Sequence, residues 1–276
     1  MPLQKTEQIK MITTKLIDGT EIFCLRKPEA KMLDHHVEGY MQHGISINDG
    51  DVVFDVGANI GVFGVRAVQK FNNVKVFAFE PIPEIFQVLK TNAEKFGSKR
   101  FFALNYGASD SNGTTTFSYF PNTPALSTSH PEMWDENPDA FESAVKGSMK
   151  SPPADMQWMK WLPTSLAGLV ARFLRSGKQM ITCELRTISS VIEEYKIEKI
   201  DLLKIDCEGA ELSAINGIAE QDWSKINKVV VEVHDMGNRV EFISNLLRKH
   251  GLTNIVKEKE KALEETALYN VYATRP

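Results

Sequence analysis

The chain has 276 residues, 42% of them hydrophobic and 25% charged, which is ordinary for a globular protein. Its 32 basic and 36 acidic residues give a formal net charge of −4, which disfavours a general nucleic-acid binder because such proteins usually carry a basic excess. No apolar run approaches the ~20 residues of a membrane span, no secretory signal opens the chain, and the cysteines form no Cys-x-x-Cys pair. We therefore expect a soluble, cytoplasmic protein without a disulfide framework.

The N-terminal part predicts a short hairpin followed by a helix. Asp18-Gly19 lies between two apolar segments, 12–17 and 21–25, and this dipeptide favours tight turns because both positions tolerate positive φ. Pro28 opens a helical stretch that stops at Gly44. The segment is too short to form its own core, so we expect it to pack across the domain that follows.

From residue 51 onward, short apolar strands alternate with amphipathic helices. A continuous apolar run, typical of a strand buried on both faces, covers residues 52–54, and further strands are predicted at 74–79, 101–104, 202–205 and 229–233. Helices are predicted at 61–70, 83–96, 210–218 and 238–250, and segments 252–256 and 267–273 form a closing antiparallel pair. This alternation predicts a doubly wound, mostly parallel seven-stranded sheet with right-handed crossovers.

The alternation is interrupted between Pro121 and Met180, in a segment rich in proline, tryptophan and methionine. A run of ~60 residues is far longer than an ordinary loop. One helix is predicted inside it, with Leu166, Leu169, Val170, Phe173 and Leu174 on its apolar face. The sheet is expected to resume with a strand at Leu185. We expect a lid that selects the substrate, because Met and Trp provide adaptable apolar contacts.

The excess length is confined to this insertion, so a single domain accounts for the whole chain. Residues 1–50 form its N-terminal cover. Residues 51–120 and 181–276 form the core, and residues 121–180 form the inserted lid.

A glycine-rich turn, Asp55-Val56-Gly57-Ala58-Asn59-Ile60-Gly61, follows the first buried strand. Glycines there allow a sharp turn and a close approach of a ligand to the main chain. The spacing Gly-x-Asn-x-Gly departs from the Gly-x-Gly-x-x-Gly of dinucleotide sites, so a ligand without phosphates fits better. Glu80 ends the second strand, where a carboxylate can accept hydrogen bonds from both ribose hydroxyls. Together these motifs predict a nucleoside site.

The chain resembles the FkbM family of S-adenosylmethionine-dependent methyltransferases in four ordered motifs: Asp55 to Gly61, Ala78-Phe79-Glu80-Pro81, Leu203-Lys204-Ile205-Asp206-Cys207-Glu208-Gly209 and Val231-Glu232-Val233-His234. The resemblance covers residues 51–273 without the insertion. It implies a class I, Rossmann-like fold, S-adenosylmethionine as cofactor, and O-methylation of a natural-product hydroxyl.

The same resemblance implies where the cofactor lies. The glycine-rich turn would hold its amino-acid half, Glu80 its ribose, and the segment after the third strand its adenine. The residues expected to bind it are Asp55, Gly57, Asn59, Ile60, Gly61, Glu80, Pro81, Asn105, Ala108 and Asp206.

Asp206, Glu208 and His234 follow the ends of two predicted strands. Adjacent parallel strands lie ~4.8 Å apart, so these three side chains can converge on one crevice. A methyl acceptor oxygen must lose its proton, and a histidine with a pKa near ~6.5 suits that task. We predict His234 as the general base, with Asp206 or Glu208 orienting it or contacting the cofactor ammonium. A carboxylate base is the close alternative.

Other interpretations stay open at this point. Asp206, Glu208, His234 and Asp235 offer ligands for a divalent cation, although nothing in the spacing requires one and no metal is predicted. N- or C-methylation would use the same cofactor site. A nicotinamide-dependent oxidoreductase is disfavoured by Asn59, and a non-catalytic nucleoside-binding module is the remaining alternative.

The partner we expect is a fairly bulky, apolar small molecule. It can arrive free or attached to an acyl or peptidyl carrier protein. The predicted helix of the insertion, with Arg172 and Arg175 on its polar side, offers a docking surface for an acidic carrier or a membrane surface. His36 and Tyr40 share a face of the N-terminal helix and can line the entrance of the site.

Overall fold

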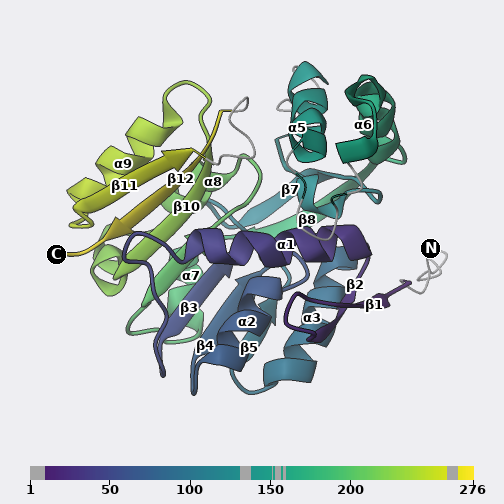
Figure 1. Cartoon of the computed structure of the whole chain (residues 1–276). Helices are drawn as coiled ribbons and strands as arrows, with labels where there is room; N and C mark the ends of the chain where they lie inside the picture. Colours follow the sequence, from purple (N-terminus) through teal and green to yellow (C-terminus); the bar gives the residue numbers. More distant parts are fainter. Residues whose placement is uncertain (1–9, 131–137, 151, 153–156, 158–159, 260–266) are drawn as a thin grey trace, which may run out of the picture.

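The structure, a computed structural model, describes residues 10–130, 138–150, 152, 157, 160–259 and 267–276. Within these residues a seven-stranded sheet lies between layers of helices (Figure 1). A three-stranded sheet and two further helices lie to one side of it.

The large sheet has the strand order β11-β12-β10-β9-β3-β4-β5. Its strands are β3 (Val52–Val56), β4 (Lys75–Phe79), β5 (Phe101–Leu104), β9 (Leu202–Ile205), β10 (Lys228–His234), β11 (Asn254–Lys259) and β12 (Leu268–Thr274). Strand β12 runs antiparallel to both of its neighbours, whereas the pairs from β10 to β5 are all parallel. The predicted mostly parallel, seven-stranded sheet is confirmed.

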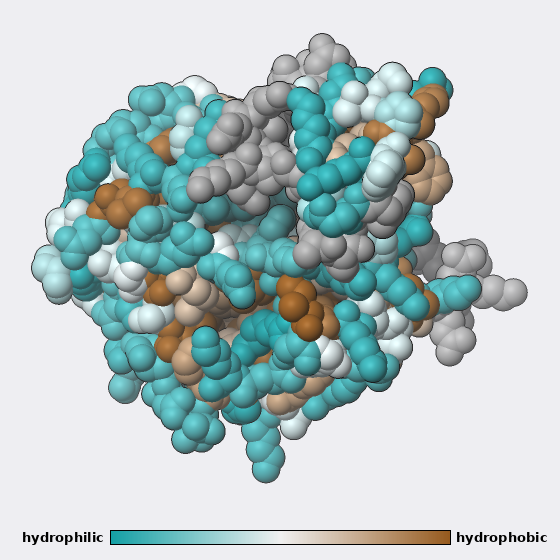
Figure 2. Space-filling model, in the orientation of Figure 1, coloured by the Kyte–Doolittle hydropathy of each residue, from teal (hydrophilic) through white to brown (hydrophobic). Residues whose placement is uncertain are grey.

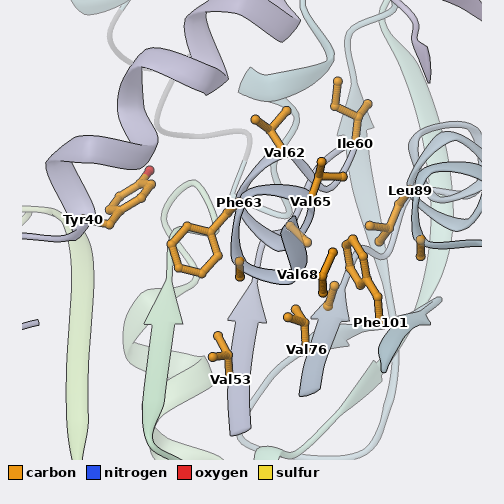
Figure 3. Packing of buried hydrophobic residues seen from close by; sticks show 14 of the residues in the cluster. Tyr40, Val53, Ile60, Val62, Phe63, Val65, Val68, Val76, Leu89 and Phe101 are labelled. Carbon is orange, nitrogen blue, oxygen red and sulfur yellow. The ribbon is translucent and has the colours of Figure 1, made fainter. Parts of the chain in front are cut away.

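Both faces of this sheet are buried, because successive side chains of each strand enter two different apolar clusters. Val53 belongs to the first cluster and its neighbour Phe54 to the second. Helices α2 (Val62–Lys70) and α3 (Pro83–Gly97) cover the first face, and α7 (Ile188–Glu194), α8 (Glu211–Asn216) and α9 (Arg239–Lys249) cover the second. Figure 3 shows side chains of α2 packing against Val53 and Val76.

The N-terminal segment forms the predicted hairpin and helix. Strands β1 (Ile12–Lys15) and β2 (Glu21–Cys24) pair antiparallel, and α1 (Lys27–Tyr40) runs across the first face of the domain (Figure 1). Ile22, Ala30 and Tyr40 are buried in the first apolar cluster. The segment is therefore part of the same core as the large sheet.

The strand expected to resume the large sheet at Leu185 lies elsewhere, so that prediction was wrong. Strand β8 (Gln179–Arg186) begins six residues earlier and pairs antiparallel with β7 (Gly113–Tyr119) and parallel with β6 (Gly107–Ala108). Its residues alternate between apolar and polar, as in Ile181-Thr182-Cys183-Glu184. Such alternation is typical of a strand with one solvated face, unlike the mostly apolar central strands.

Two helices of the insertion, α5 (Pro138–Lys150) and α6 (Ala167–Arg175), pack together around a small third cluster. The helix predicted there exists, and part of its expected apolar face packs as predicted, because Val170 and Leu174 contact the third cluster. Ala167 and Ala171 are buried, whereas Leu169 and Phe173 are 63% and 62% exposed. Figure 2 shows apolar atoms over α6 at the upper right of the molecule. The short 3-10 turns are η1 (Pro124–Leu126), η3 (Thr164–Leu166) and η4 (Glu220–Lys225).

None of the helices in the described residues combines the length and the apolar composition that crossing a bilayer requires.

Candidate functional site

A cavity of about 220 Å³ lies where β3, β4 and β9 end. In the strand order, β3 lies between β4, the next strand of this sheet along the chain, and β9, which comes much later in the chain. Open α/β sheets bind ligands at the point where the strand order reverses in this way. Residues following the three strands line the cavity: Gly57, Asn59, Glu80, Pro81, Ile82, Asp206, Cys207 and Glu208. The opposite wall comes from the small sheet and the start of the insertion: Gly107, Ala108, Thr115, Phe117, Leu185, Ser127, Ser129 and His130.

The glycine-rich turn brings its main chain into this wall. Gly57 has a φ of +74°, and a Cβ there would lie 1.7 Å from the backbone oxygen of Asp206. Glycine is therefore required for the loops after β3 and β9 to approach each other. The N–H groups of Gly57 and Ala58 both donate to the carbonyl of Phe79, at 3.2 and 2.9 Å, which ties the turn to the end of β4.

Not every predicted cofactor residue of the turn reaches the cavity. Gly57 and Asn59 line it, whereas Asp55, Ile60 and Gly61 do not. Asp55 is fully buried, Ile60 packs in the first apolar cluster, and Gly61 precedes α2 with a φ of +84°. These three residues therefore support the conformation of the turn and are not part of the cavity wall.

Glu80 is a buried carboxyl group in the cavity wall, with only 5% of its surface exposed. Its Oε1 accepts a hydrogen bond from the backbone N–H of Ile82 at 2.9 Å. Burial raises the pKa of Glu80 to about 8, although the N–H groups of Ile82 and Asn59 act in the opposite direction. A ligand that brings hydroxyl donors to this carboxyl group would replace the solvation it has lost.

Asn105 and Ala108 have different positions. The Nδ2 of Asn105 donates to the backbone oxygens of Glu80 and Pro81, at 3.0 and 3.1 Å, and Asn105 is not part of the cavity wall. It holds the turn after β4 in place. Ala108 lines the cavity, beside Gly107 and Ser109.

Lys204, which the sequence motifs did not single out, links two of the acidic residues. Its Nζ lies 2.9 Å from Oδ1 of Asp55 and 3.7 Å from Oδ2 of Asp206, and its side chain is only 4% exposed. Burial lowers the pKa of Lys204, but the two carboxylates outweigh it, so the pKa is raised and the cation is retained. Tyr40 of α1 donates its hydroxyl to Oδ2 of Asp206 at 2.7 Å. The lysine and the tyrosine together hold Asp206 in the wall.

The structure brings Glu208 and His234 together, as the strand order predicts. Oε2 of Glu208 lies 3.5 Å from Nε2 of His234 and has no hydrogen-bond partner among the described residues. The other ring nitrogen, Nδ1, lies 3.2 Å from Oε1 of Glu211, a residue that the sequence motifs did not single out. Glu208 is among the residues that line the cavity, whereas His234 is not.

Burial and neighbouring charges shift the pKa of both groups. Burial raises the pKa of Glu208 to about 8, with Asp206 and Glu211 adding to the rise and His234 opposing it. Burial lowers the pKa of His234, but the hydrogen bond with Glu211 and the charges of Glu208, Glu211 and Asp206 outweigh it, so that its pKa is raised. The pair therefore retains protons at a pH where an exposed carboxylate and an exposed histidine would lose them.

Among the described residues, the insertion contributes Pro124, Ala125, Ser127, Ser129 and His130 to the cavity wall, and no Met or Trp. Of the described Met and Trp side chains there, Trp161 is 88% exposed, Met180 is 60% exposed and Met149 packs between α5 and α6. The rest, Met133, Trp134, Met156, Trp158 and Met159, lie outside the described residues. Ser127, Ser129 and His130 line the cavity instead, and Thr128 between them donates its hydroxyl to the backbone oxygen of Glu208 at 2.6 Å.

A metal centre does not emerge from the part of the chain that the structure describes, where no three His, Cys, Asp or Glu side chains are grouped to hold an ion. Asp235, considered as a ligand together with His234, accepts a hydrogen bond from the backbone N–H of Val240 at 3.0 Å and so stabilises the start of α9.

A family model described as the methyltransferase FkbM domain matches residues 55–252. The 31-O-demethyl-FK506 methyltransferase FkbM of Streptomyces tacrolimicus is 32% identical over 95% of this chain and 96% of its own length. Methyltransferase sdnD of Sordaria araneosa is 32% identical over 87% of this chain and 89% of its own. The crystal structure of methyltransferase FkbM from Methylobacillus flagellatus KT has the same fold, with a TM-score of 0.50 and 14% identity over 84% of this chain and 46% of that one. The chain belongs to the FkbM methyltransferase family.

Proposed function

We propose that this protein is an S-adenosylmethionine-dependent O-methyltransferase acting on a hydroxyl group of a small-molecule natural product. The observation that carries the proposal is a pair of carboxyl groups among the residues of one cavity wall: the buried Glu80 after β4, and the half-buried Glu208 after β9, whose Oε2 atom is buried. Glu80 is suited to accept hydrogen bonds from ribose hydroxyls, and Glu208 is suited to accept a proton from the methyl acceptor. The name of the Streptomyces relative, which specifies a 31-O-demethyl substrate, agrees with oxygen as the acceptor atom.

The residues of the cavity fit the cofactor. Glu80 would accept hydrogen bonds from the ribose hydroxyls, and the main chain at Gly57 and Asn59 would lie along the amino-acid half. Asp206, held by Lys204 and Tyr40, places a carboxylate in the same wall, where it suits an ammonium group. S-adenosylmethionine, when bound, supplies a methyl group activated as a sulfonium.

Glu208 is better placed than His234 to take the acceptor proton. Glu208 is among the residues that line the cavity, and its buried Oε2 has no hydrogen-bond partner among the described residues. A general base must come within hydrogen-bond reach of the proton it removes, and His234 is not among the residues that line the cavity. We therefore favour the carboxylate alternative of the two bases considered from the sequence, with His234 as the group that shares the proton.

Calorimetric titration with S-adenosylhomocysteine tests the cofactor half of the proposal. We expect wild-type protein to bind it and Glu80→Ala to lose at least tenfold in affinity, the size of ~1.4 kcal/mol. Glu94→Ala is the matched control, because Glu94 is exposed on α3 and does not line the cavity. Unchanged affinity in Glu80→Ala would contradict the ribose assignment.

The reaction half is tested by incubating the protein with S-adenosylmethionine and a panel of hydroxylated and aminated natural products. Mass spectrometry should find the added methyl group on oxygen. A protein that methylates only amines would favour the N-methyltransferase alternative.

A further inference from the structure

Glu211 is a charged residue with no exposed surface, at the first position of α8. Burying a carboxylate is costly unless its oxygens are hydrogen bonded or paired with a cation. Both of its oxygens meet this requirement. Oε1 accepts from the N–H of Gly209 at 2.6 Å, and Oε2 accepts from Nη1 of Arg239 at 3.3 Å. Because a donor approaches each oxygen, both Oε1 and Oε2 of Glu211 act as hydrogen-bond acceptors.

This arrangement determines which nitrogen of His234 carries the hydrogen. Nδ1 lies 3.2 Å from Oε1 of Glu211, and a carboxylate can only accept hydrogen bonds. Nδ1 is therefore the N–H of the ring. In the neutral histidine Nε2 then carries the lone pair, and Nε2 is the atom that lies 3.5 Å from Oε2 of Glu208.

The backbone around Glu211 keeps it in this position. Arg239, the first residue of α9, donates from the same Nη1 to the backbone oxygen of Gly209 at 2.9 Å. The guanidinium thus bridges the carboxylate of Glu211 and the loop that carries Glu208. The loop after β9, the start of α8 and the start of α9 are joined at one point, on the side of His234 away from the cavity.

We infer that Glu211 is a positioning residue that holds His234 with Nδ1 protonated, so that Nε2 faces Glu208 and the two side chains share one transferable proton. The use of this arrangement in catalysis rests on the proposed function. There, the O–H bond of the acceptor breaks, its proton moves to the carboxylate of Glu208, and Nε2 of His234, which lies 3.5 Å from the buried Oε2, can receive it from Glu208. The resulting imidazolium is stabilised by Glu211.

Among the residues that the structure describes, the charged groups that face His234 come from three elements. Asp206 and Glu208 belong to the loop after β9, Glu211 to α8, and Arg239 to α9. Glu211 is the one that contacts the ring nitrogen remote from the cavity. Its removal should therefore change the tautomer, whereas loss of a more distant charge would change only the affinity for the proton.

Nitrogen-15 NMR of the full chain with labelled histidine tests the inference without any acceptor. In wild-type protein we expect the neutral ring of His234, assigned with His234→Asn, to be the Nδ1–H tautomer. In Glu211→Gln the pKa of His234 should fall by about one unit, because an opposite charge within hydrogen-bond distance is lost, and the tautomers should mix. Glu220→Gln is the matched control: Glu220 lies 3.5 Å from Nδ1 of His250, so it should affect His250 and leave His234 unchanged.

An Nε2–H tautomer in wild-type protein would overturn the inference, and so would an unchanged pKa and tautomer in Glu211→Gln. If Glu211→Gln does not fold, the tautomer of His234 in wild-type protein still supports or overturns the inference. Failure of the proposed function is seen separately, as a protein that does not bind S-adenosylhomocysteine while His234 has the expected tautomer. Once an acceptor is in hand, Glu211→Gln should move the pH dependence of turnover to lower pH and leave cofactor affinity unchanged.

Discussion

Nε2 of His234 lies 3.5 Å from Oε2 of Glu208, and this carboxylate oxygen is buried without a hydrogen-bond partner in the described part of the chain. Two groups this close titrate as a pair, so their apparent pKa values belong to the pair rather than to either residue. Both groups hold their protons to a higher pH than usual. A base built from this pair becomes active near neutral or mildly alkaline pH.

The pH dependence of methyl transfer should reflect this pair. In the proposed reaction the active base is the deprotonated form, and burial raises the pKa of Glu208, as part of this pair, to about 8, so turnover should rise from pH 6.5 to above 8 rather than near pH 4–5. His234→Gln removes a group that lowers the pKa of Glu208, so the rise should move to higher pH. Initial rates between pH 5.5 and 9.5 check this, and a rate that is flat from pH 6 to 9 would contradict it.

Lys204 should contribute more to stability than an exposed lysine with a similar partner. Lys204→Met leaves Asp55 buried without its cation, and breaking a buried pair in this way costs about 3–5 kcal/mol. Lys199→Met is the control, because Lys199 is 59% exposed where it contacts Asp201, and an exposed pair contributes about 0–1 kcal/mol. Urea unfolding measures both. Equal losses in the two variants would show that the buried network is not stabilising.

Gly57 should not tolerate even one additional carbon atom. Gly57→Ala places a Cβ 1.7 Å from a backbone oxygen and at positive φ, so we expect a loss of more than about 1 kcal/mol of stability and weaker cofactor binding. Gly113→Ala has open space around the new Cβ, so it should stay close to wild type. Thermal unfolding with and without S-adenosylhomocysteine compares the two. A Gly57→Ala protein as stable as Gly113→Ala would refute the close approach of the two loops.

The contribution of Glu80 to the free energy of unfolding should decrease as the pH rises. Its folded-state pKa is about 8 and its ordinary value is 4.5, so the folded state binds the proton more tightly. The stability this contributes is fully present below pH 4.5 and is lost as the pH rises through 8. Glu80→Gln, which cannot ionise, should show a flatter dependence of the free energy of unfolding between pH 5 and 8. Parallel curves for the variant and the wild type would contradict this assignment.

Much of the fold could be predicted because the central strands are buried on both faces and are therefore mostly apolar. The convergence of Glu208 and His234 follows from the same logic, since the carboxyl ends of neighbouring parallel strands meet at one edge of the sheet. Strand β8 was misplaced because pairing partners are not visible in a single sequence. Its partner β7 lies across the whole insertion.

The contacts that hold the site in place were harder to predict. Lys204 stands out as a charge inside an apolar strand, which indicates a buried partner but not which one. That partner, Asp55, is 149 residues away and is brought close by the pairing of β3 with β9. Asn105 was assigned to the adenine from its position after β5, whereas its side chain is engaged by the backbone of Glu80 and Pro81. Such contacts depend on side-chain directions that strand order does not determine.

Methyl transfer by the Glu208→Gln variant tests most directly whether the carboxylate of Glu208 takes the acceptor proton. S-adenosylmethionine with a labelled methyl group, incubated with the hydroxylated acceptor that wild-type protein methylates, should transfer the label at least ~10²-fold more slowly with the variant, the usual size of a general-base effect. Calorimetry should show wild-type affinity for S-adenosylhomocysteine, and Glu198→Gln, an exposed residue outside the cavity, should behave as wild type. Transfer at the wild-type rate by Glu208→Gln would contradict the assignment of the proton to this carboxylate.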